Sequence, residues 1–114
     1  MTIFVFGSNR EGRHGKGAAS LARQYHGAIY GQPRGLQGRS YAIITKELRR
    51  GYPAVTLQEI RLGVNEFLDF ATRNPTFTFY VTRIGCGLAG FTEIQIAPMF
   101  LFAPANCKLT FKNS

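Results

Sequence analysis

The sequence predicts a single α/β domain over residues 1–114: a compact three-layer fold with a mainly parallel sheet and helices on both faces. Short apolar runs alternate along the chain with segments whose apolar residues recur at helical spacing. The apolar run at residues 41–44 has no polar interruption, which is typical of a parallel strand buried on both faces. Alternation of this kind implies right-handed crossovers that place helices over the sheet.

The expected elements follow in chain order. They are a strand at 3–6, a helix at 16–26, a loop at 28–38 with an extended piece at 28–30, a strand at 40–45, a helix from Thr56 to Asn74, a strand at 77–82, a helix at 93–102 and a strand at 108–111. Thr56 and Glu59 form a capping box at the start of the long helix, and Pro75 ends it. Thr92 caps the last helix, which Pro98 must shorten or distort.

The bulk composition narrows the class of protein. The formal net charge is +8, from 14 Lys and Arg against 6 Asp and Glu, which favours anionic partners such as nucleotides or nucleic acid. The apolar runs are too short to span a membrane, and the N-terminus enters a strand without a signal-peptide pattern, so we expect a cytoplasmic protein. The two cysteines have no metal-ligand spacing, and we predict no metal and no cofactor.

A glycine-rich turn joins the first strand to the first helix. It reads FGSNREGRHGKGAA over residues 6–19. A strand, a glycine turn and a helix start form an arrangement that binds phosphate through main-chain N–H groups. The spacing matches neither the dinucleotide fingerprint nor the P-loop, so an ordinary strand-to-helix turn remains the alternative.

A second glycine-rich loop, RIGCGLAGF at residues 83–91, follows a later strand, and Lys46 follows the strand between the two loops. Ligands of parallel α/β sheets bind beyond the carboxyl ends of the strands. Because all three segments leave those ends, we expect them to meet at one edge of the sheet. Their shared edge favours an anion site more than either loop does alone.

On these residues the chain resembles a macrodomain. The resemblance is closest to the branch with the terminal ADP-ribose–glutamate glycohydrolase and the antitoxin macrodomain that reverses DNA ADP-ribosylation. The matching stretches are GKGAA at 15–19, YAIITK at 41–46, TLQ at 56–58 and RIGCGL at 83–88. They occur in the family's order and cover nearly the whole chain.

The resemblance implies an ADP-ribose pocket. Gly15 and Gly17 would approach the distal ribose and the pyrophosphate, residues 85–90 would wrap the diphosphate, and Phe91 or Tyr30 would stack on adenine. The ligand-binding residues implied are Ser8, Asn9, Gly15, Lys16, Gly17, Thr45, Gly85, Cys86, Gly87, Leu88, Ala89, Gly90 and Phe91. The partner would be ADP-ribose or an ADP-ribosylated macromolecule.

Catalysis is the open question. In the glycohydrolase branch the lysine that matches Lys46 attacks the anomeric carbon, which requires a neutral amine. The family's catalytic aspartate falls here on Ala89. His14 titrates near neutral pH and is a candidate acid or base, with a hydrogen-bonding role as its alternative. A helix start beside Cys86 would lower the pKa of its thiol, and simple packing is the alternative there.

Three functions therefore stand as expectations. The first is binding of ADP-ribose or a related nucleotide, as a reader or as a protein that sequesters a nucleotide signal. The second is an ADP-ribosyl glycohydrolase that uses Lys46. The third is a basic nucleic-acid-binding module, argued from charge alone.

Overall fold

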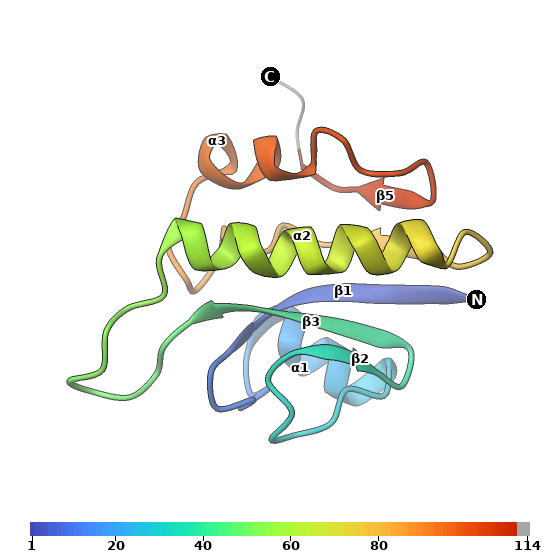
Figure 1. Ribbon diagram of the computed structural model, residues 1–114. Coiled ribbons are helices and arrows are strands. Elements are labelled where there is room, and N and C mark those ends of the chain that lie inside the picture. Colours follow the sequence, from blue (N-terminus) through green and yellow to red (C-terminus); the bar gives the residue numbers. More distant parts are fainter. Residues whose placement is uncertain (112–114) are drawn as a thin grey trace.

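Five strands form one mixed sheet in the order β2-β3-β1-β4-β5 in the computed structural model, which describes residues 1–111 (Figure 1). The elements are β1 Thr2–Asn9, α1 Gly17–Tyr25, β2 Gly35–Gln37, β3 Ser40–Lys46, α2 Leu57–Arg73, β4 Thr78–Val81, α3 Glu93–Ile96, the 3-10 turn η1 Ala97–Phe100, and β5 Cys107–Leu109. All neighbouring strands are parallel except the pair β2 and β3. The predicted α/β class and mainly parallel sheet are confirmed.

The central strand β1 sends alternate side chains to opposite faces of the sheet. Ile3 and Val5 join the larger apolar cluster, which contains the buried faces of α2, α3 and η1. Phe6 joins the smaller cluster with Ala19 and Ala22 of α1. Helices therefore cover both faces of the sheet, as Figure 1 shows for α1 and α2.

The long helix α2 begins and ends where the sequence predicts. The Thr56 hydroxyl accepts a hydrogen bond from the Glu59 amide, and the Glu59 carboxylate accepts one from the Thr56 amide. This reciprocal cap satisfies two main-chain donors at the start of the helix. On its apolar face Phe67 is fully buried and lies edge-on to Phe79 of β4.

The short strand β2 lies where a loop was expected, and the predicted extended piece at 28–30 is not a strand. Gly38 and Arg39 form a two-residue turn that pairs Gln37 with Ser40. Gly38 has φ +59°, and its Cα lies so close to Gly27 that a side chain would collide with the Gly27 carbonyl. This contact between two distant glycines is not visible in local sequence.

Three other boundaries differ from the predictions. The helix predicted at 93–102 ends at Ile96 and continues as η1 to Phe100, because Pro98 cannot continue the α-helical hydrogen bonds. The last strand is Cys107–Leu109 rather than 108–111, since its partner β4 ends at Val81, opposite Leu109. The first strand is longer than predicted, because the polar residues 7–9 still pair with β3.

No helix within residues 1–111 is long and apolar enough to cross a membrane.

Candidate functional site

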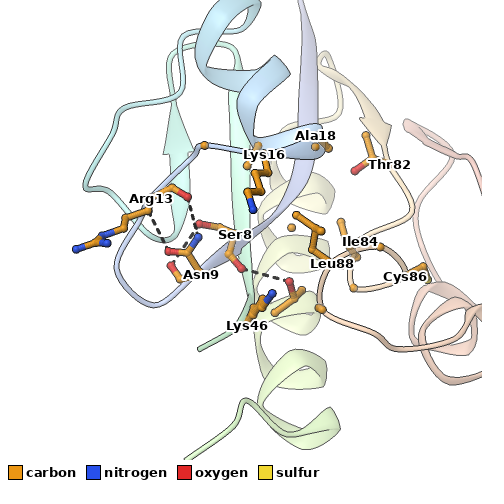
Figure 2. A pocket seen from close by; sticks show the side chains of 18 of the residues that line it. Ser8, Asn9, Arg13, Lys16, Ala18, Lys46, Thr82, Ile84, Cys86 and Leu88 are labelled. Carbon is orange, nitrogen blue, oxygen red and sulfur yellow. Dashed lines mark hydrogen bonds between the residues drawn. The ribbon is translucent and has the colours of Figure 1, made fainter. Parts of the chain in front are cut away.

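A pocket of about 800 Å³ lies at the carboxyl ends of β1, β3 and β4 (Figure 2). Both glycine-rich loops contribute to it. Its lining residues are Gly7, Ser8, Asn9, Arg13, Gly15, Lys16, Gly17, Ala18, Ala19, Tyr30, Thr45, Lys46, Leu48, Thr82, Arg83, Ile84, Gly85, Cys86, Gly87, Leu88 and Ala89. The two loops and Lys46 therefore meet at one edge of the sheet, as the strand order requires.

Gly7 lets the strands and the second glycine loop close together beneath the pocket. A β-carbon at this position would lie 3.1 Å from Thr45 Oγ1 and 3.4 Å from the Gly85 nitrogen. The Thr45 hydroxyl donates to the Ser8 carbonyl at 3.2 Å. The absence of a side chain at Gly7 therefore lets β1, β3 and the second loop approach one another at the floor of the pocket.

Asn9 builds the first glycine loop by bonding to its main chain. Its Nδ2 donates to the Arg13 carbonyl at 2.8 Å, and its Oδ1 accepts from the Arg13 amide at 2.9 Å. The Gly12 amide donates to the Asn9 carbonyl. Both polar atoms of the Asn9 side chain are therefore engaged in holding the loop.

The helix α1 begins in the pocket without a side-chain cap. Lys16 is its N-cap residue, with extended backbone angles, and the first helical amide to find an acceptor is that of Ser20. Within residues 1–111 the amides of Gly17, Ala18 and Ala19 donate to nothing. Such amides and the helix dipole favour an anion at this point.

The second glycine loop also offers consecutive free amides. The amides of Cys86, Gly90 and Phe91 are used within the loop, where they donate to the carbonyls of Arg83, Gly87 and Gly85. In the described part of the chain, the amides of Gly87, Leu88 and Ala89 have no acceptor. Successive free amides in a turn form an anion-binding concavity.

The charged side chains of the lining are all cationic: Arg13, Lys16, Lys46 and Arg83. Arg13 is paired with Glu11 at 3.0 Å, and Arg83 is paired with Glu93. Neither lysine has an ion-pair partner among residues 1–111 (Figure 2 shows both). The pocket therefore holds two uncompensated positive charges beside the free amides.

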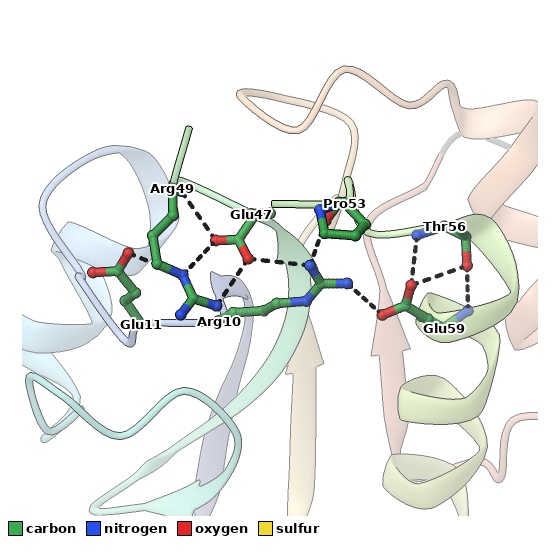
Figure 3. Close-up of polar contacts among 7 residues, drawn as sticks. All are labelled: Arg10, Glu11, Glu47, Arg49, Pro53, Thr56 and Glu59. Atoms are coloured by element: carbon green, nitrogen blue, oxygen red, sulfur yellow. Dashed lines mark hydrogen bonds and ion pairs between the residues drawn. The ribbon is translucent and has the colours of Figure 1, made fainter. Parts of the chain in front are cut away.

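An ion-pair network fixes the segment that follows Lys46 (Figure 3). Glu47 accepts from Arg49 at 2.9 Å and from Arg10 at 3.1 Å, and Arg10 also reaches Glu59 on α2 at 2.7 Å. The bonds from Arg49 and then from Arg10 lower the pKa of the Glu47 carboxyl to about 2. The Glu47 carboxylate is bound by Arg10 and Arg49, and it does not line the pocket.

His14 lies beneath the pocket instead of facing it. Its side chain is fully buried, it is absent from the lining, and its Nε2 lies 3.3 Å from the Ser8 hydroxyl. Its Nδ1 has no hydrogen-bond partner in the described residues, and the ring packs edge-on to Phe6. Burial, reinforced by the charge of Arg23, lowers the pKa of His14 and favours the neutral ring.

Most of the residues predicted to bind ligand do line the pocket, and so does Lys46, the predicted catalytic lysine. Gly90 and Phe91 do not: the Gly90 amide bonds back to Gly87, and Phe91 packs against the main apolar cluster. Tyr30 does line the pocket, so it is the aromatic residue within reach of a ligand there.

The thiol of Cys86 differs from the expectation. Burial raises its pKa, whereas a helix start beside it was expected to lower that pKa. The helix α3 begins seven residues later, at Glu93, so its first amides are those of other residues. Cys86 is therefore favoured as a neutral thiol in the wall of the pocket.

The lining also contains residues that the sequence did not assign to the site: Gly7, Arg13, Ala18, Ala19, Leu48, Thr82, Arg83 and Ile84. Thr82 directly follows β4, so its place at the carboxyl edge of the sheet was a usable signal. Leu48 had no such signal, because its position depends on the network around Glu47.

Comparison with known proteins finds structures with a similar fold, but it does not assign the chain to a family. No family model matches the chain, and no curated protein matches it. Two solved structures from Bacteroides thetaiotaomicron are similar. One, described as a protein of unknown function, has a TM-score of 0.55 and 18% identity, and the match covers 88% of this chain and 79% of that one. The other has a TM-score of 0.59 and 18% identity, over 95% of this chain and 87% of that one.

Proposed function

We propose that the pocket binds the diphosphate of ADP-ribose or of a related nucleotide. One observation carries the proposal: two sets of three consecutive free amides, 17–19 and 87–89, line one pocket. A diphosphate presents several strong acceptor oxygens, and two phosphoryl groups match two sets of donors. Main-chain amides bind such groups well because they are already fixed in place.

The charge and size of the pocket support a nucleotide. Among residues 1–111, Lys16 and Lys46 supply two uncompensated charges and no carboxylate lines the pocket, so these residues do not repel an anion there. The volume of about 800 Å³ lies within the range of roughly 300–1,000 Å³ of small-molecule sites. Tyr30, Leu48 and Leu88 add apolar surface against which a base can rest.

In this proposal the chain is a macrodomain-like protein of the glycohydrolase and antitoxin branch, with a three-layer form of that fold. The support is the order of the motifs GKGAA, IITK and RIGCGL and the pocket that they line together. The similarity to solved structures at 18% identity supports the fold alone.

Binding without turnover is the activity that the site supports best. A glycosidic bond is cleaved with the help of a carboxylate acid or base. Ala89 stands at the aspartate position of the family, and Glu11, Glu47 and Glu93 lie in ion pairs outside the lining. The protein would then read ADP-ribosyl groups or sequester a nucleotide signal.

Hydrolysis by Lys46 is the second candidate, because Lys46 lines the pocket and has no ion-pair partner within residues 1–111. Its amine would attack the anomeric carbon of the distal ribose and displace the attached group. Water would then cleave the bond between Lys46 and the sugar.

The two candidates separate in a paired experiment. Isothermal titration with ADP-ribose, with ribose 5-phosphate as the matched control, tests binding; we expect heat from ADP-ribose alone. No heat and no thermal shift at millimolar ADP-ribose would refute the binding proposal.

Incubation with ADP-ribosylated protein and DNA then tests turnover by comparing wild type with Lys46→Ala. Release of ADP-ribose by wild type but not by the variant would establish the enzyme.

A further inference from the structure

Lys46 lies at an irregular point of the sheet. Ser8 of β1 is opposite Ile44 of β3, but the next residue, Asn9, is opposite Lys46. Thr45 is therefore an extra residue in β3, and such a bulge changes the direction of the side chains beside it. Thr45 and Lys46 are consecutive and both line the pocket, whereas successive side chains of a regular strand point to opposite faces. The direction of Lys46 therefore depends on what holds the chain after the bulge.

Arg10 bonds to Lys46 and to the residue that follows it (Figure 3). The Arg10 amide donates to the Lys46 carbonyl at 3.1 Å. The Arg10 guanidinium donates to the Glu47 carboxylate at 3.1 Å and to Glu59 at 2.7 Å, and it also donates to the Pro53 carbonyl. One arginine thus links the end of β1, the chain after the bulge and the start of α2.

Glu47 is the acidic member of this network that directly follows Lys46. Its side chain is only 3% exposed, and Arg49 also bonds to it, at 2.9 Å. With a pKa of about 2, the Glu47 carboxyl is charged at neutral pH, so both arginines hold it there. Lys46 itself has no ion-pair partner among residues 1–111, so its charge remains available to a ligand.

We infer that Glu47, held by Arg10 and Arg49, is a positioning residue for Lys46: it fixes the chain after the bulge so that the Lys46 amine stays in the pocket. This role rests on the proposed function, because Glu47 acts on the ligand only through Lys46. The carboxylate itself lies outside the lining and touches no ligand.

Removal of the Glu47 charge separates positioning from simple electrostatics. A carboxylate near an anion site repels the ligand, so charge alone predicts that Glu47→Gln binds ADP-ribose more tightly. Loss of positioning predicts weaker binding, because a mobile lysine must be ordered when the ligand binds. The two explanations therefore predict changes of opposite sign.

The test is a double-mutant cycle of Glu47→Gln and Lys46→Ala, with calorimetric titration of ADP-ribose into the full chain. We expect Glu47→Gln to weaken binding about threefold to tenfold when Lys46 is present, and to change it by less than about twofold in the Lys46→Ala background. Only a role that acts through Lys46 gives this dependence; a general distortion of the pocket would weaken binding in both backgrounds.

Three outcomes overturn the inference and leave the proposed function standing, provided that wild type binds ADP-ribose. They are a loss that persists in the Lys46→Ala background, unchanged or tighter binding by Glu47→Gln, and unchanged binding by Lys46→Ala. Absence of binding by wild type removes both the inference and the proposed function.

Asp69→Asn is the matched control. It also converts a carboxylate to an amide and breaks an ion pair, with Arg73 at 2.9 Å, but on an exposed part of α2 outside the pocket. It should not weaken binding in either background.

Arg10→Lys replaces Glu47→Gln in the cycle if the latter does not fold. It keeps the positive charge but lacks the planar fork that bonds to Glu47 and Glu59 together. It should weaken binding only when Lys46 is present. Unchanged affinity, or an equal loss in the Lys46→Ala background, would overturn the inference.

Discussion

Gly15 and Gly87 come from two different loops of one pocket, and a β-carbon at either position would meet no atom within 4 Å. Neither residue has the positive φ angle that Gly17 and Gly90 have. The folded chain itself therefore does not require glycine at these two positions. A ligand that lies directly against the main chain would require it.

Alanine at Gly15 or Gly87 is therefore expected to separate folding from binding. Each variant should retain its stability within about 1 kcal/mol, because the backbone and the neighbours accept a methyl group. The affinity for ADP-ribose should fall about tenfold or more, because overpacking against a ligand costs about 1–3 kcal/mol. Thermal melts and calorimetry measure the two effects. Gly63→Ala in α2, outside this pocket, is the control for affinity alone, because its β-carbon would lie 3.2 Å from Ile43 Cγ2 and can change the stability. Unchanged affinity in both pocket variants would show that no ligand reaches this backbone.

Lys16 and Lys46, which have no ion-pair partner in the described part of the chain, are expected to act on the ligand by charge. Lys16→Ala and Lys46→Ala should each weaken ADP-ribose binding about tenfold, because a hydrogen bond to a charged group contributes about 1.5–3 kcal/mol. The double variant should also lose much of the salt dependence of binding. Arg61→Ala removes the same charge from an exposed position on α2 and should leave the affinity unchanged. An equal loss in Arg61→Ala would mean that net charge, and not the site, drives binding.

The Glu47 network is expected to make the fold sensitive to acid. The pKa of Glu47 is about 2 in the folded chain, below its ordinary value near 4.5. The charged carboxylate therefore stabilises the fold above about pH 4.5, and this contribution is lost as the pH falls toward 2. Glu47→Gln should be less stable than wild type at pH 7, and the difference should shrink between pH 4.5 and 2. Urea denaturation at several pH values measures this. A difference that does not change with pH would rule out a role for the charge.

Buried His14 should add a second pH dependence at a higher pH. Its folded-state pKa lies below the ordinary 6.5, so the unfolded chain takes up a proton more readily than the folded chain. Stability should therefore be fully present above about pH 6.5 and should fall as the pH drops below that value. His14→Gln keeps a polar group near Ser8 and should lose this pH dependence, whatever its absolute stability. Thermal melts of wild type and His14→Gln at pH 7.5 and pH 5.5 provide the comparison. An equal fall in melting temperature between the two pH values in both proteins would contradict a buried neutral ring at His14.

Local sequence patterns predicted the parts of the fold that depend on near neighbours. The capping box of Thr56 and Glu59 and the apolar stripe of α2 lie within one helix, so both could be read directly. The strands around residues 3–6 and 41–44 are continuously apolar and were placed correctly. The hairpin of β2 was missed, because it depends on the close approach of Gly38 to Gly27.

The candidate site likewise has parts that the sequence predicted and parts that it did not. Parallel strand order brought Lys46 and the two glycine loops to one edge, which the alternation of elements was enough to predict. The position of His14 was not predictable, because the loop that carries it folds inward and places the ring against Phe6. The carboxylate of Glu47 likewise gave no local sign that Arg10 would reach it across the fold.

By itself, the sequence determined the alternation of strands and helices, the excess of positive charge and the glycine content of the two loops, because each is a property of adjacent residues. Only the tertiary structure decided which amides stay free, which polar side chains are already engaged and which charges are compensated. The physical reason is that hydrogen bonds and ion pairs join residues far apart in the chain, and a group can bind a ligand only if the fold has not used it.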